Sequence, residues 1–525
     1  MYQCLDCGGD LKFDIPSQML SCSYCNKLVS PYSVTKESDA YQNNFFEARF
    51  FMCPQCGGEI CTVDNEIASF CNYCGASAVL TERMKNERCP DHIIPFKVTK
   101  EECKKVYEKS VKKAIFTPKE LRSSKYIEGF RGIYMPYWTY DMSQNGEVSI
   151  KGKKTYREGE YEVTDYYNLN GNLSSRFRGD NYDASANFYD EISGALAPYD
   201  LSEREEFTPS FLSGFYADAA DVSKEVYLDD AKDFTENTNM RKICKEPAFS
   251  DIHICEENGR PITKKWPEAK ADHIWSALFP VWFLSYRNKD RVAYVTVNGQ
   301  TGKVVADMPV DMKKYIFVSI IVSLLFFVYL NCFLILRPMV VLNLCLFLLL
   351  FTAIFYNKEM KKIYYKEHLT LDKGLFWKKE NVILITRRKY ASKKRLETLG
   401  IALLVILMYY NLFIKMAVDF ITTSKYVAGI VMIGMILCEY SAIKMKTKID
   451  NKKMSKGIFF SIIGTLISAV IFLFEPMSDI WFFVSIILIM VAIIFNLIDI
   501  VKYFNRIAMR RLPQYDKKGG NHSVE

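Results

Sequence analysis

The sequence of 525 residues predicts a multi-domain protein with two small β modules, an α+β soluble domain and an all-α six-helix transmembrane region. Three observations support this: a repeated array of cysteine pairs, a long polar stretch with mixed helix and strand patterns, and a series of apolar segments after residue 314. The net charge of +8 is divided in the same way. Residues 1–314 carry 40 Lys+Arg against 47 Asp+Glu, and residues 315–525 carry 28 against 13. The positive charge therefore belongs to the apolar half, which is typical of a membrane protein.

The first element is an array of Cys-x2-Cys pairs. Two pairs are separated by 14 residues, and the whole set recurs 49 positions further on. Zn²⁺ prefers four thiolates in a tetrahedron, and two such pairs joined by a short β-hairpin can supply them. Residues 1–34 and 50–82 are therefore predicted to form two zinc ribbons, each with one structural Zn²⁺ ion. The predicted ligands are Cys4, Cys7, Cys22, Cys25, Cys53, Cys56, Cys71 and Cys74.

Other interpretations of these cysteines exist. A Cys-x2-Cys pair can be a thioredoxin-type redox motif, but that motif normally occurs once and in a βαβ context. A zinc-dependent redox sensor also remains open, because thiolates can be oxidised. Four thiolates leave no open coordination position, so the sites are predicted to be structural. Cys61 and Cys103 lack partner spacing and are predicted to be packing residues.

Residues 90–312 are predicted to form a cytosolic α+β domain with an internal duplication. Helices are expected at Thr99–Ile115 and at about Asp221–Lys245. A strand follows each of them, at Ile133–Tyr140 and at Leu278–Leu284, and each strand contains Pro-x-Trp and precedes a hairpin. The clearest hairpin turns at Asn298-Gly299, because both residues tolerate positive φ. The aromatic residues of these strands could line a ligand groove, but core packing is the favoured use.

Residues 313–501 are predicted to form the six-span region. A bilayer core requires about 20 apolar residues per helix, and each segment is apolar on all sides. The first two segments are separated only by Arg337-Pro338, so this pair could instead be re-entrant. The six segments are Tyr315–Leu336, Pro338–Tyr356, Thr398–Ile414, Tyr426–Ile443, Gly457–Phe474 and Ile480–Val501.

The distribution of Lys and Arg predicts the orientation. The loop Asn357–Glu397 carries 13 of them, the loop Lys444–Lys456 carries six, and the tail after Val501 carries six. Basic loops stay on the cytosolic side, so both termini, including the tail 502–525, are predicted to be cytosolic. The sequence opens without a signal peptide pattern, which agrees with an amino-terminal domain retained in the cytosol. We expect a multi-pass protein of the plasma membrane. Anionic headgroups of the inner leaflet are the nearest polyanionic candidate partner.

A few small and polar residues interrupt the apolar segments. Glu439, Asn496 and Asp499 could line an ion or substrate path. They lie near predicted cytosolic helix ends, where they could be hydrated or paired, so a structural role is favoured. Small residues on one side of the fifth span predict a helix-packing face: Gly457, Ser461, Gly464 and Ser468.

Functional classes can be weighed on these features. The sequence contains neither a phosphate-binding loop nor a metalloprotease motif, and no catalytic constellation points to an enzyme. A binding or scaffolding protein with a protein partner at the cytosolic face is therefore favoured. Membrane transport or lipid handling, with the ribbons as a regulatory domain, is one alternative. A membrane-tethered nucleic-acid-binding protein is another, but residues 1–80 hold four Lys+Arg against nine Asp+Glu, and phosphate binding requires positive charge.

The sequence resembles the transcription-factor-IIB-type zinc-ribbon membrane proteins of Gram-positive bacteria. The resemblance covers roughly residues 1–312 and implies zinc binding by the eight cysteines but no activity. The six-span region departs from it, because many relatives have fewer spans. Besides the cysteine array, it rests on the order of five short motifs: Ile94–Lys97, Tyr134–Trp138, Phe211–Tyr216, Phe279–Trp282 and Asn298–Lys303.

Overall fold

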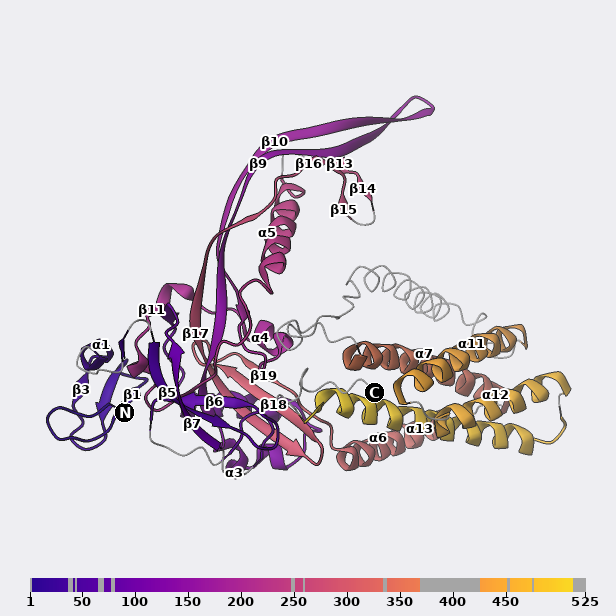
Figure 1. Cartoon of the computed structure of the whole chain (residues 1–525). Coiled ribbons are helices and arrows are strands. Elements are labelled where there is room, and N and C mark those ends of the chain that lie inside the picture. The colour runs from indigo at the N-terminus through magenta and orange to yellow at the C-terminus, as the bar shows by residue number, and fades with distance from the viewer. Residues whose placement is uncertain are drawn as a thin grey trace.

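A β-rich region and a helical bundle make up the molecule, which is seen here in a computed structural model (Figure 1). The N-terminus lies in the β-rich region, and the last helix of the bundle returns to it. The structure describes residues 2–512 except 36–40, 43–44, 65–69, 77–80, 247–250, 258–259, 334–337, 369–424, 451–453 and 475.

The first cysteine module, residues 2–35, is a three-stranded antiparallel sheet followed by a short helix. Its strands are β1 (Leu11–Asp14), β2 (Met19–Cys22) and β3 (Leu28–Val29), and its helix is α1 (Pro31–Thr35). The predicted hairpin between the cysteine pairs is present as β1–β2. On the buried face, the Phe13 ring lies 5.3 Å from that of Phe211. The module therefore rests on the larger domain.

The second cysteine module, residues 45–88, is part of the large sheet. It contains β5 (Phe45–Met52), β6 (Glu59–Thr62) and β7 (Thr81–Arg88), and β4 (Tyr41–Gln42) pairs with β5. Cys61 of β6 pairs with Ala217 of β12 (Tyr216–Ala217). β12 in turn pairs in parallel with the central strand β9. The sequence suggests a separate module that closes locally, whereas the structure joins this one to the domain through a shared sheet.

Two long antiparallel strands form the centre of the soluble domain. β9 (Arg131–Glu158) pairs with β17 (Lys270–Asn288), and each is followed by a hairpin partner. The partner of β9 is β10 (Tyr161–Asp183), and the partner of β17 is β18 (Arg291–Asn298), which also pairs with β19 (Val304–Ala306). The predicted strands are confirmed, but both extend well beyond their predicted ends.

Each half of the domain also contains the predicted helix. α2 (Lys100–Lys113) begins at a capping box, in which the hydroxyl of Thr99 accepts from the N–H of Glu102 and the Glu102 carboxylate accepts from the N–H of Thr99. α5 (Leu228–Ile243) begins seven residues later than predicted. The remaining elements are β8 (His92–Ile93), η1 (Glu120–Arg122), α3 (Ser124–Ile127), α4 (Asp190–Leu196), η2 (Leu201–Glu203), β11 (Glu205–Glu206), η3 (Pro209–Leu212), β13 (His253–Ile254), β14 (Glu256–Glu257), β15 (Arg260–Pro261) and β16 (Thr263–Lys265).

The two Pro-x-Trp motifs have matching contacts. Trp138 Nε1 donates to the carbonyl of Val222, shortly before α5, at 2.7 Å. Trp282 Nε1 donates to the carbonyl of Val98, shortly before α2, at 2.8 Å. Each tryptophan therefore holds the segment that leads into the helix of the other half, as the inferred duplication would produce. The aromatic residues beside the prolines pack in the core: Tyr137 and Phe279 are stacked at 4.4 Å and buried.

The turn between β18 and β19 differs in detail from the prediction. Asn298 and Gly299 do not have positive φ; Gly302 does, at 73°. The Asn298 side chain instead accepts from the backbone N–H groups of Gln300 and Thr301, both at 2.9 Å. Asparagine thus supports this turn through its side-chain oxygen.

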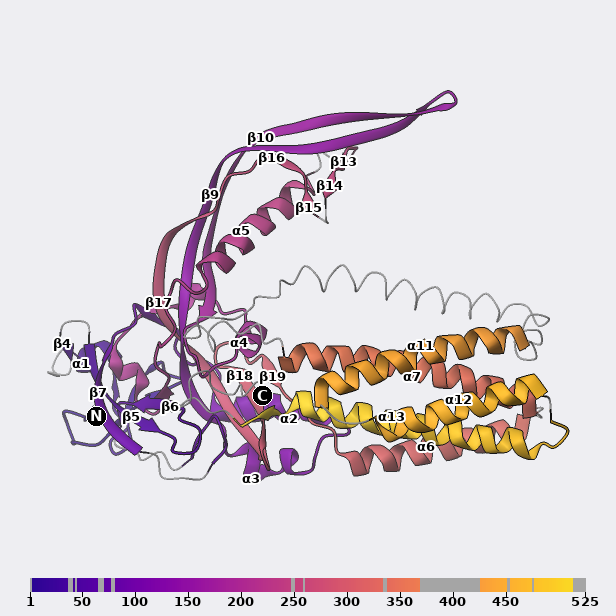
Figure 2. The same cartoon turned by 45° about the vertical axis from the view of Figure 1, so that its right-hand side comes forward.

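The β9–β10 hairpin continues beyond the sheet as a projection, which we call the arm (residues 144–176). It rises from the domain and then bends, and its outer part points in the direction in which the helices of the bundle run away from the sheet (Figures 1 and 2). α5, β13 and β16 lie against the arm or its base. The length of this hairpin was not predicted.

The bundle contains four described helices that are long and apolar enough to cross a membrane. They are α7 (Pro338–His368), α11 (Lys425–Asp450), α12 (Lys456–Phe474) and α13 (Ile480–Ala508). They correspond to the second, fourth, fifth and sixth predicted spans. Where the sequence predicts six spans, the described residues thus provide four. α6 (Met312–Phe333) is a helix over most of the first predicted span, and the third, Thr398–Ile414, lies outside the described residues.

The predicted small-residue face of α12 is confirmed as a packing face, since all four residues are buried. A Cβ atom on Gly464 would lie 3.0 Å from Ile489 Cγ1 of α13, and the hydroxyls of Ser468 and Ser485 are 2.8 Å apart. Glu439 of α11 is also buried, and the Ser461 hydroxyl of α12 donates to its carboxylate at 2.6 Å. Glu439 is therefore hydrogen-bonded inside the bundle, which fits the structural role expected from the sequence.

The C-terminal end of the bundle returns to the soluble domain. α13 extends to Ala508, beyond the predicted end at Val501, and Arg510–Arg511 (β20) pairs with Arg291 and Val292 of β18. Asn505 exchanges two hydrogen bonds of 2.7 Å with the backbone of Val310. The first residues of the predicted tail 502–525 thus complete α13, and the next ones add a strand to the sheet.

Candidate metal centres

The four Cys-x2-Cys turns share one backbone geometry. The N–H of the first cysteine donates to the carbonyl of the residue five positions later, at 2.8–3.0 Å. The residue after the second cysteine donates its N–H to the carbonyl of the first, again at 2.8–3.0 Å. These two bonds fold each pair into a tight loop that directs both sulfurs to the same side. The residues after the second cysteines are Gly8, Asn26, Gly57 and Gly75.

Those four residues all have positive φ, between 56° and 72°. Glycine adopts this conformation without steric cost, and asparagine is one of the few other residues that tolerate it. The sequence predicts the role of the glycines. It misses Asn26, although the signal is present in its place directly after Cys25.

Each set of four cysteines brings its sulfur atoms together, so that all lie within 4.8 Å of one another. In the first set, Cys7 Sγ lies 3.3 Å from Cys22 Sγ, and Cys4 Sγ lies 3.7 Å from Cys25 Sγ. In the second set the equivalent distances are 3.6 Å and 3.7 Å. The structure thus assembles both predicted ligand sets, although the pairs within each set are 14 residues apart in the sequence.

The chemistry of these sets fits a soft, tetrahedral cation. Four thiolates so close together repel one another and cannot all ionise without a compensating positive charge. Sulfur ligands select ions such as Zn²⁺, and four of them make a closed site. Both groups could therefore hold a metal ion, and neither offers a position for a substrate.

The two centres differ in exposure. Cys53, Cys56, Cys71 and Cys74 are all buried, whereas Cys7 and Cys25 of the first centre are exposed. The contrast extends to equivalent residues within the turns. Tyr24 lies between Cys22 and Cys25 and is 84% exposed, while Tyr73, its counterpart 49 positions later, is 1% exposed.

The second centre is anchored to the domain through Tyr73. The Tyr73 hydroxyl donates to Asp218 Oδ2 at 2.7 Å, and the Tyr73 carbonyl accepts from the hydroxyl of Tyr294 at 2.7 Å. The Ser185 hydroxyl also donates to Asp218. Burial raises the pKa of Asp218 to about 7 in spite of these donors. A further bond to the domain comes from Arg287, whose Nη1 donates to Gln55 Oε1, between Cys53 and Cys56, at 2.7 Å.

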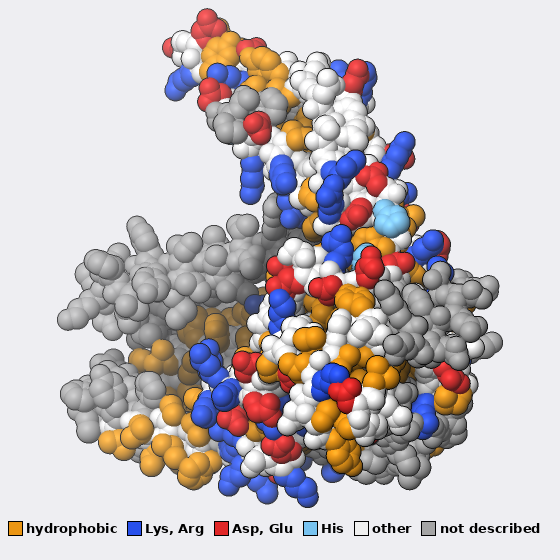
Figure 3. All heavy atoms as spheres, turned by 90° about the vertical axis from the view of Figure 1, so that its left-hand side faces the viewer, with side chains coloured by type: hydrophobic (Ala, Val, Ile, Leu, Met, Phe, Trp, Pro, Cys, Tyr) orange, Lys and Arg blue, Asp and Glu red, His pale blue; other side chains and the backbone are white. Residues whose placement is uncertain are grey.

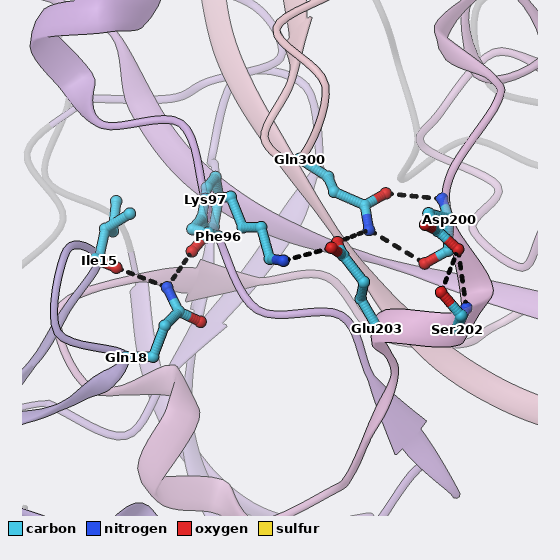
Figure 4. A network of polar contacts seen from close by, with 8 residues as sticks. All are labelled: Ile15, Gln18, Phe96, Lys97, Asp200, Ser202, Glu203 and Gln300. Atoms are coloured by element: carbon cyan, nitrogen blue, oxygen red, sulfur yellow. Dashed lines mark hydrogen bonds and ion pairs between the residues drawn. The ribbon is translucent and has the colours of Figure 1, made fainter.

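The first cysteine module is bonded to the domain at the end opposite its cysteine turns. Gln18, in the β1–β2 turn, donates through Nε2 to the carbonyls of Ile15 and Phe96, and at the adjacent Lys97 the ammonium pairs with Glu203 (Figure 4). Gln300 donates to the same Glu203 carboxylate at 2.6 Å. The sulfur-bearing turns lie at the other end of the module from this network.

Three cysteines outside the two sets, Cys61, Cys89 and Cys103, lie in or against the hydrophobic core. Cys61 and Cys103 are buried, and burial raises the pKa of each thiol well above its usual range. Burial also raises the pKa of Cys89 to about 11. These thiols stay protonated at neutral pH, which does not suit a metal ligand or a nucleophile.

Comparison with known proteins places one relative beside this chain. The uncharacterized protein YdjG of Bacillus subtilis (strain 168) is 29% identical over 323 residues, which cover 60% of this chain and 91% of the relative. No family model matches the chain, and no solved structure matches it. The resemblance to transcription-factor-IIB-type proteins therefore stays a prediction, whereas the two four-cysteine groups are present.

Proposed function

We propose that the protein is a multi-pass membrane protein that presents two zinc ribbons and an α+β domain to the cytosol, and that it is a binding or scaffolding protein without enzymatic activity. The closed four-sulfur centres support a structural role for the metal. The four apolar helices support a membrane location. Both are joined to one β-rich domain, which suits a protein that holds a partner at a membrane surface.

The exposed turns of the first centre carry the binding part of this proposal. Leu5 and Tyr24 lie inside its two Cys-x2-Cys turns and are 81% and 84% exposed. In the second centre the residue equivalent to Tyr24 is Tyr73, which is buried against the domain. The same surface is thus used within the chain by one module and left open by the other.

The contacts of Tyr73 indicate what such a surface recognises. Its hydroxyl donates to a carboxylate, and its ring lies 6.1 Å from the ring of Phe283. Tyrosine is well suited to interfaces because its apolar ring and polar tip are used together. We infer that the partner offers an aromatic or aliphatic surface with a hydrogen-bond acceptor to Tyr24.

The path of the chain supports six spans and cytosolic termini. The chain leaves the domain at Met312 and returns to it at Arg510, so a bundle embedded in a membrane would cross it an even number of times. With α6 added to the four candidate spans, five helices would cross. An even number then requires a sixth crossing, which the predicted span Thr398–Ile414 would supply. The basic loops favour the cytosolic side for the domain.

Site-specific cross-linking tests this function. A photoreactive benzoyl-phenylalanine replaces Tyr24 in the full chain in native membranes, and the matched control replaces Tyr73. We expect a discrete adduct with a second protein at Tyr24 only, and we expect it to disappear when Cys7→Ser is added. Metal analysis of the purified protein should find two zinc ions per chain. A Tyr24 probe without an adduct, or one that reacts equally with Cys7→Ser present, would count against the binding function.

Transport is the second candidate, and the buried Glu439 favours it. Its carboxylate lies between α11 and α12 and accepts from Ser461, and a small cavity beside it is also lined by Asn496 of α13. Intramembrane carboxylates are costly and often mark ion paths. Ion flux into proteoliposomes that is lost in Glu439→Gln would support transport, and equal flux in both would leave Glu439 a packing residue.

A further inference from the structure

The arm has an exposed aromatic end. Its tip, which we define as residues 151–167, holds four tyrosines on a two-stranded ribbon. Tyr161 and Tyr166 are 77% and 75% exposed, and Tyr156 and Tyr167 are 42% and 39% exposed. In the space-filling view, hydrophobic and charged side chains mix at this end of the arm (Figure 3).

The register of the hairpin places most of these rings on one face. Val163 lies opposite Tyr156, Gly152 opposite Tyr167, and Glu158 opposite Tyr161. Residues opposite each other, and residues two apart along a strand, share a face. Tyr156, Tyr161 and Tyr167 therefore share one face with Val163. By the same register, Lys154, Glu158 and Asp165 lie on that face between the rings.

The inner end of this face is covered by the protein itself. A Cβ atom on Gly152 would lie 2.5 Å from Ile252 Cγ2, just before β13, and 3.4 Å from Leu169. Further out, the face is exposed at Tyr156 and Tyr161. The face is thus closed by the protein at its inner end, and its tyrosine rings lie in an open surface at the tip.

The direction of the arm determines what this surface can meet. In both cartoon views the outer arm points the same way as α7, α11, α12 and α13 run from the domain (Figures 1 and 2). With these helices across a bilayer, the tip points toward the membrane surface next to the bundle. Tyrosine is enriched where membranes meet water, because the ring enters the apolar region and the hydroxyl stays hydrated.

We propose that the tip of the arm inserts its tyrosines into the interface of the cytosolic leaflet and so forms a second membrane contact beside the bundle. The proposal rests on the proposed membrane location. The tip carries four basic residues, Lys151, Lys153, Lys154 and Arg157, and four acidic ones, Glu158, Glu160, Glu162 and Asp165. Because these charges balance, the contact depends on the aromatic face and not on anionic lipid, and added salt leaves it intact.

A spin label can locate the tip in the full-length protein. Tyr161→p-acetyl-phenylalanine supplies a ketone for labelling, so the 16 native cysteines stay unmodified. The protein is placed in nanodiscs of phosphatidylcholine, and in a second set with equal parts of phosphatidylglycerol. Collision of the label with oxygen reports the membrane interior, and collision with a water-soluble nickel chelate reports the aqueous phase. Matched labels stand at Asn172, exposed further back on the arm, and at Leu473, 78% exposed on α12.

We expect a ratio of oxygen to nickel collisions at Tyr161 several-fold higher than at Asn172, in both lipid mixtures and at high salt. A label at Thr164 should lose this excess in the triple variant Tyr156→Ser, Tyr161→Ser and Tyr167→Ser. Equal ratios at Tyr161 and Asn172, with Leu473 in lipid, would overturn the proposal and leave the membrane location standing. An immobile Tyr161 label that nickel still reaches would assign the tip to a protein contact instead. A water-exposed Leu473 would overturn the membrane location itself.

Discussion

The difference in burial between the two metal centres predicts opposite consequences for one chemical change. Cys7 and Cys56 are equivalent in the repeat, each being the second cysteine of the first pair in its set. Cys7 is exposed and Cys56 is 1% exposed. Cys7→Ser and Cys56→Ser each remove one of four ligands, and each should release the metal ion from its own centre.

The size of the effect follows from what each centre supports. A structural zinc ion contributes about 10–16 kcal/mol of binding free energy in small zinc domains, while whole domains are stable by about 5–15 kcal/mol. Loss of the second ion would also leave three thiols in a core that contains Tyr73 and Tyr294. The expected loss is therefore comparable to the entire stability of the soluble domain. The first centre lies at the edge of a separate three-stranded sheet, so its loss stays local.

Limited proteolysis of the detergent-purified full chain, combined with metal analysis, measures both outcomes. We expect each variant to retain one zinc ion per chain. Cys7→Ser should be cleaved within residues 2–35 and keep residues 90–312 resistant. Cys56→Ser should be cleaved throughout residues 90–312. If Cys56→Ser leaves that region as resistant as in the unchanged protein, the second centre does not support the domain and the reasoning is refuted.

Three further changes test individual contacts. Tyr294→Phe removes the buried bond to the Tyr73 carbonyl and should lower the unfolding free energy by about 1 kcal/mol, seen as a lower melting midpoint. Gly464→Ala adds a Cβ atom 3.0 Å from α13 and should lower detergent resistance of the bundle, whereas Gly429→Ala, with nothing within 4 Å, should not. Asp218 has a folded pKa of about 7 against an ordinary value of 3.8, so its stabilisation is complete below pH 4 and lost as the pH rises through 7. The decline amounts to about 4 kcal/mol of unfolding free energy. Asp218→Asn should abolish it, so that the melting midpoint no longer falls over this pH range.

The parts of this molecule that the sequence predicts are those encoded locally. Four-cysteine spacing determines both metal centres, because each ligand turn needs only its own residues. Apolar segments of sufficient length likewise identify α7, α11, α12 and α13, because hydropathy does not depend on a distant partner. The helix α2 follows from its charge pattern in the same way.

The parts that were missed depend on distant residues. Tyr24 and Tyr73 stand in nearly the same local sequence, Ser-Tyr-Cys and Asn-Tyr-Cys. Residues more than a hundred positions away, among them Asp218, Phe283 and Tyr294, make the second turn buried where the first is exposed. The arm was missed because its outer residues are mostly polar, so the alternation of apolar side chains that marks a half-buried strand is weak there.

The return of the chain at Arg510 changes how its basic residues are understood. By charge alone, this residue belongs to a cytosolic tail that orients the bundle. In the structure its guanidinium lies 4.0 Å from the Tyr189 ring and 3.6 Å from Asp307 Oδ2, while its backbone pairs with β18. At the start of the first helix, α6, Lys314 Nζ donates to the carbonyl of Thr117 at 2.6 Å. The first and last helices are thus both bonded to the domain that the second cysteine module helps to build. A domain joined to both the first and the last helix cannot turn freely relative to the bundle. The bundle therefore sets the directions in which the domain holds the arm and the exposed turns of the first cysteine module.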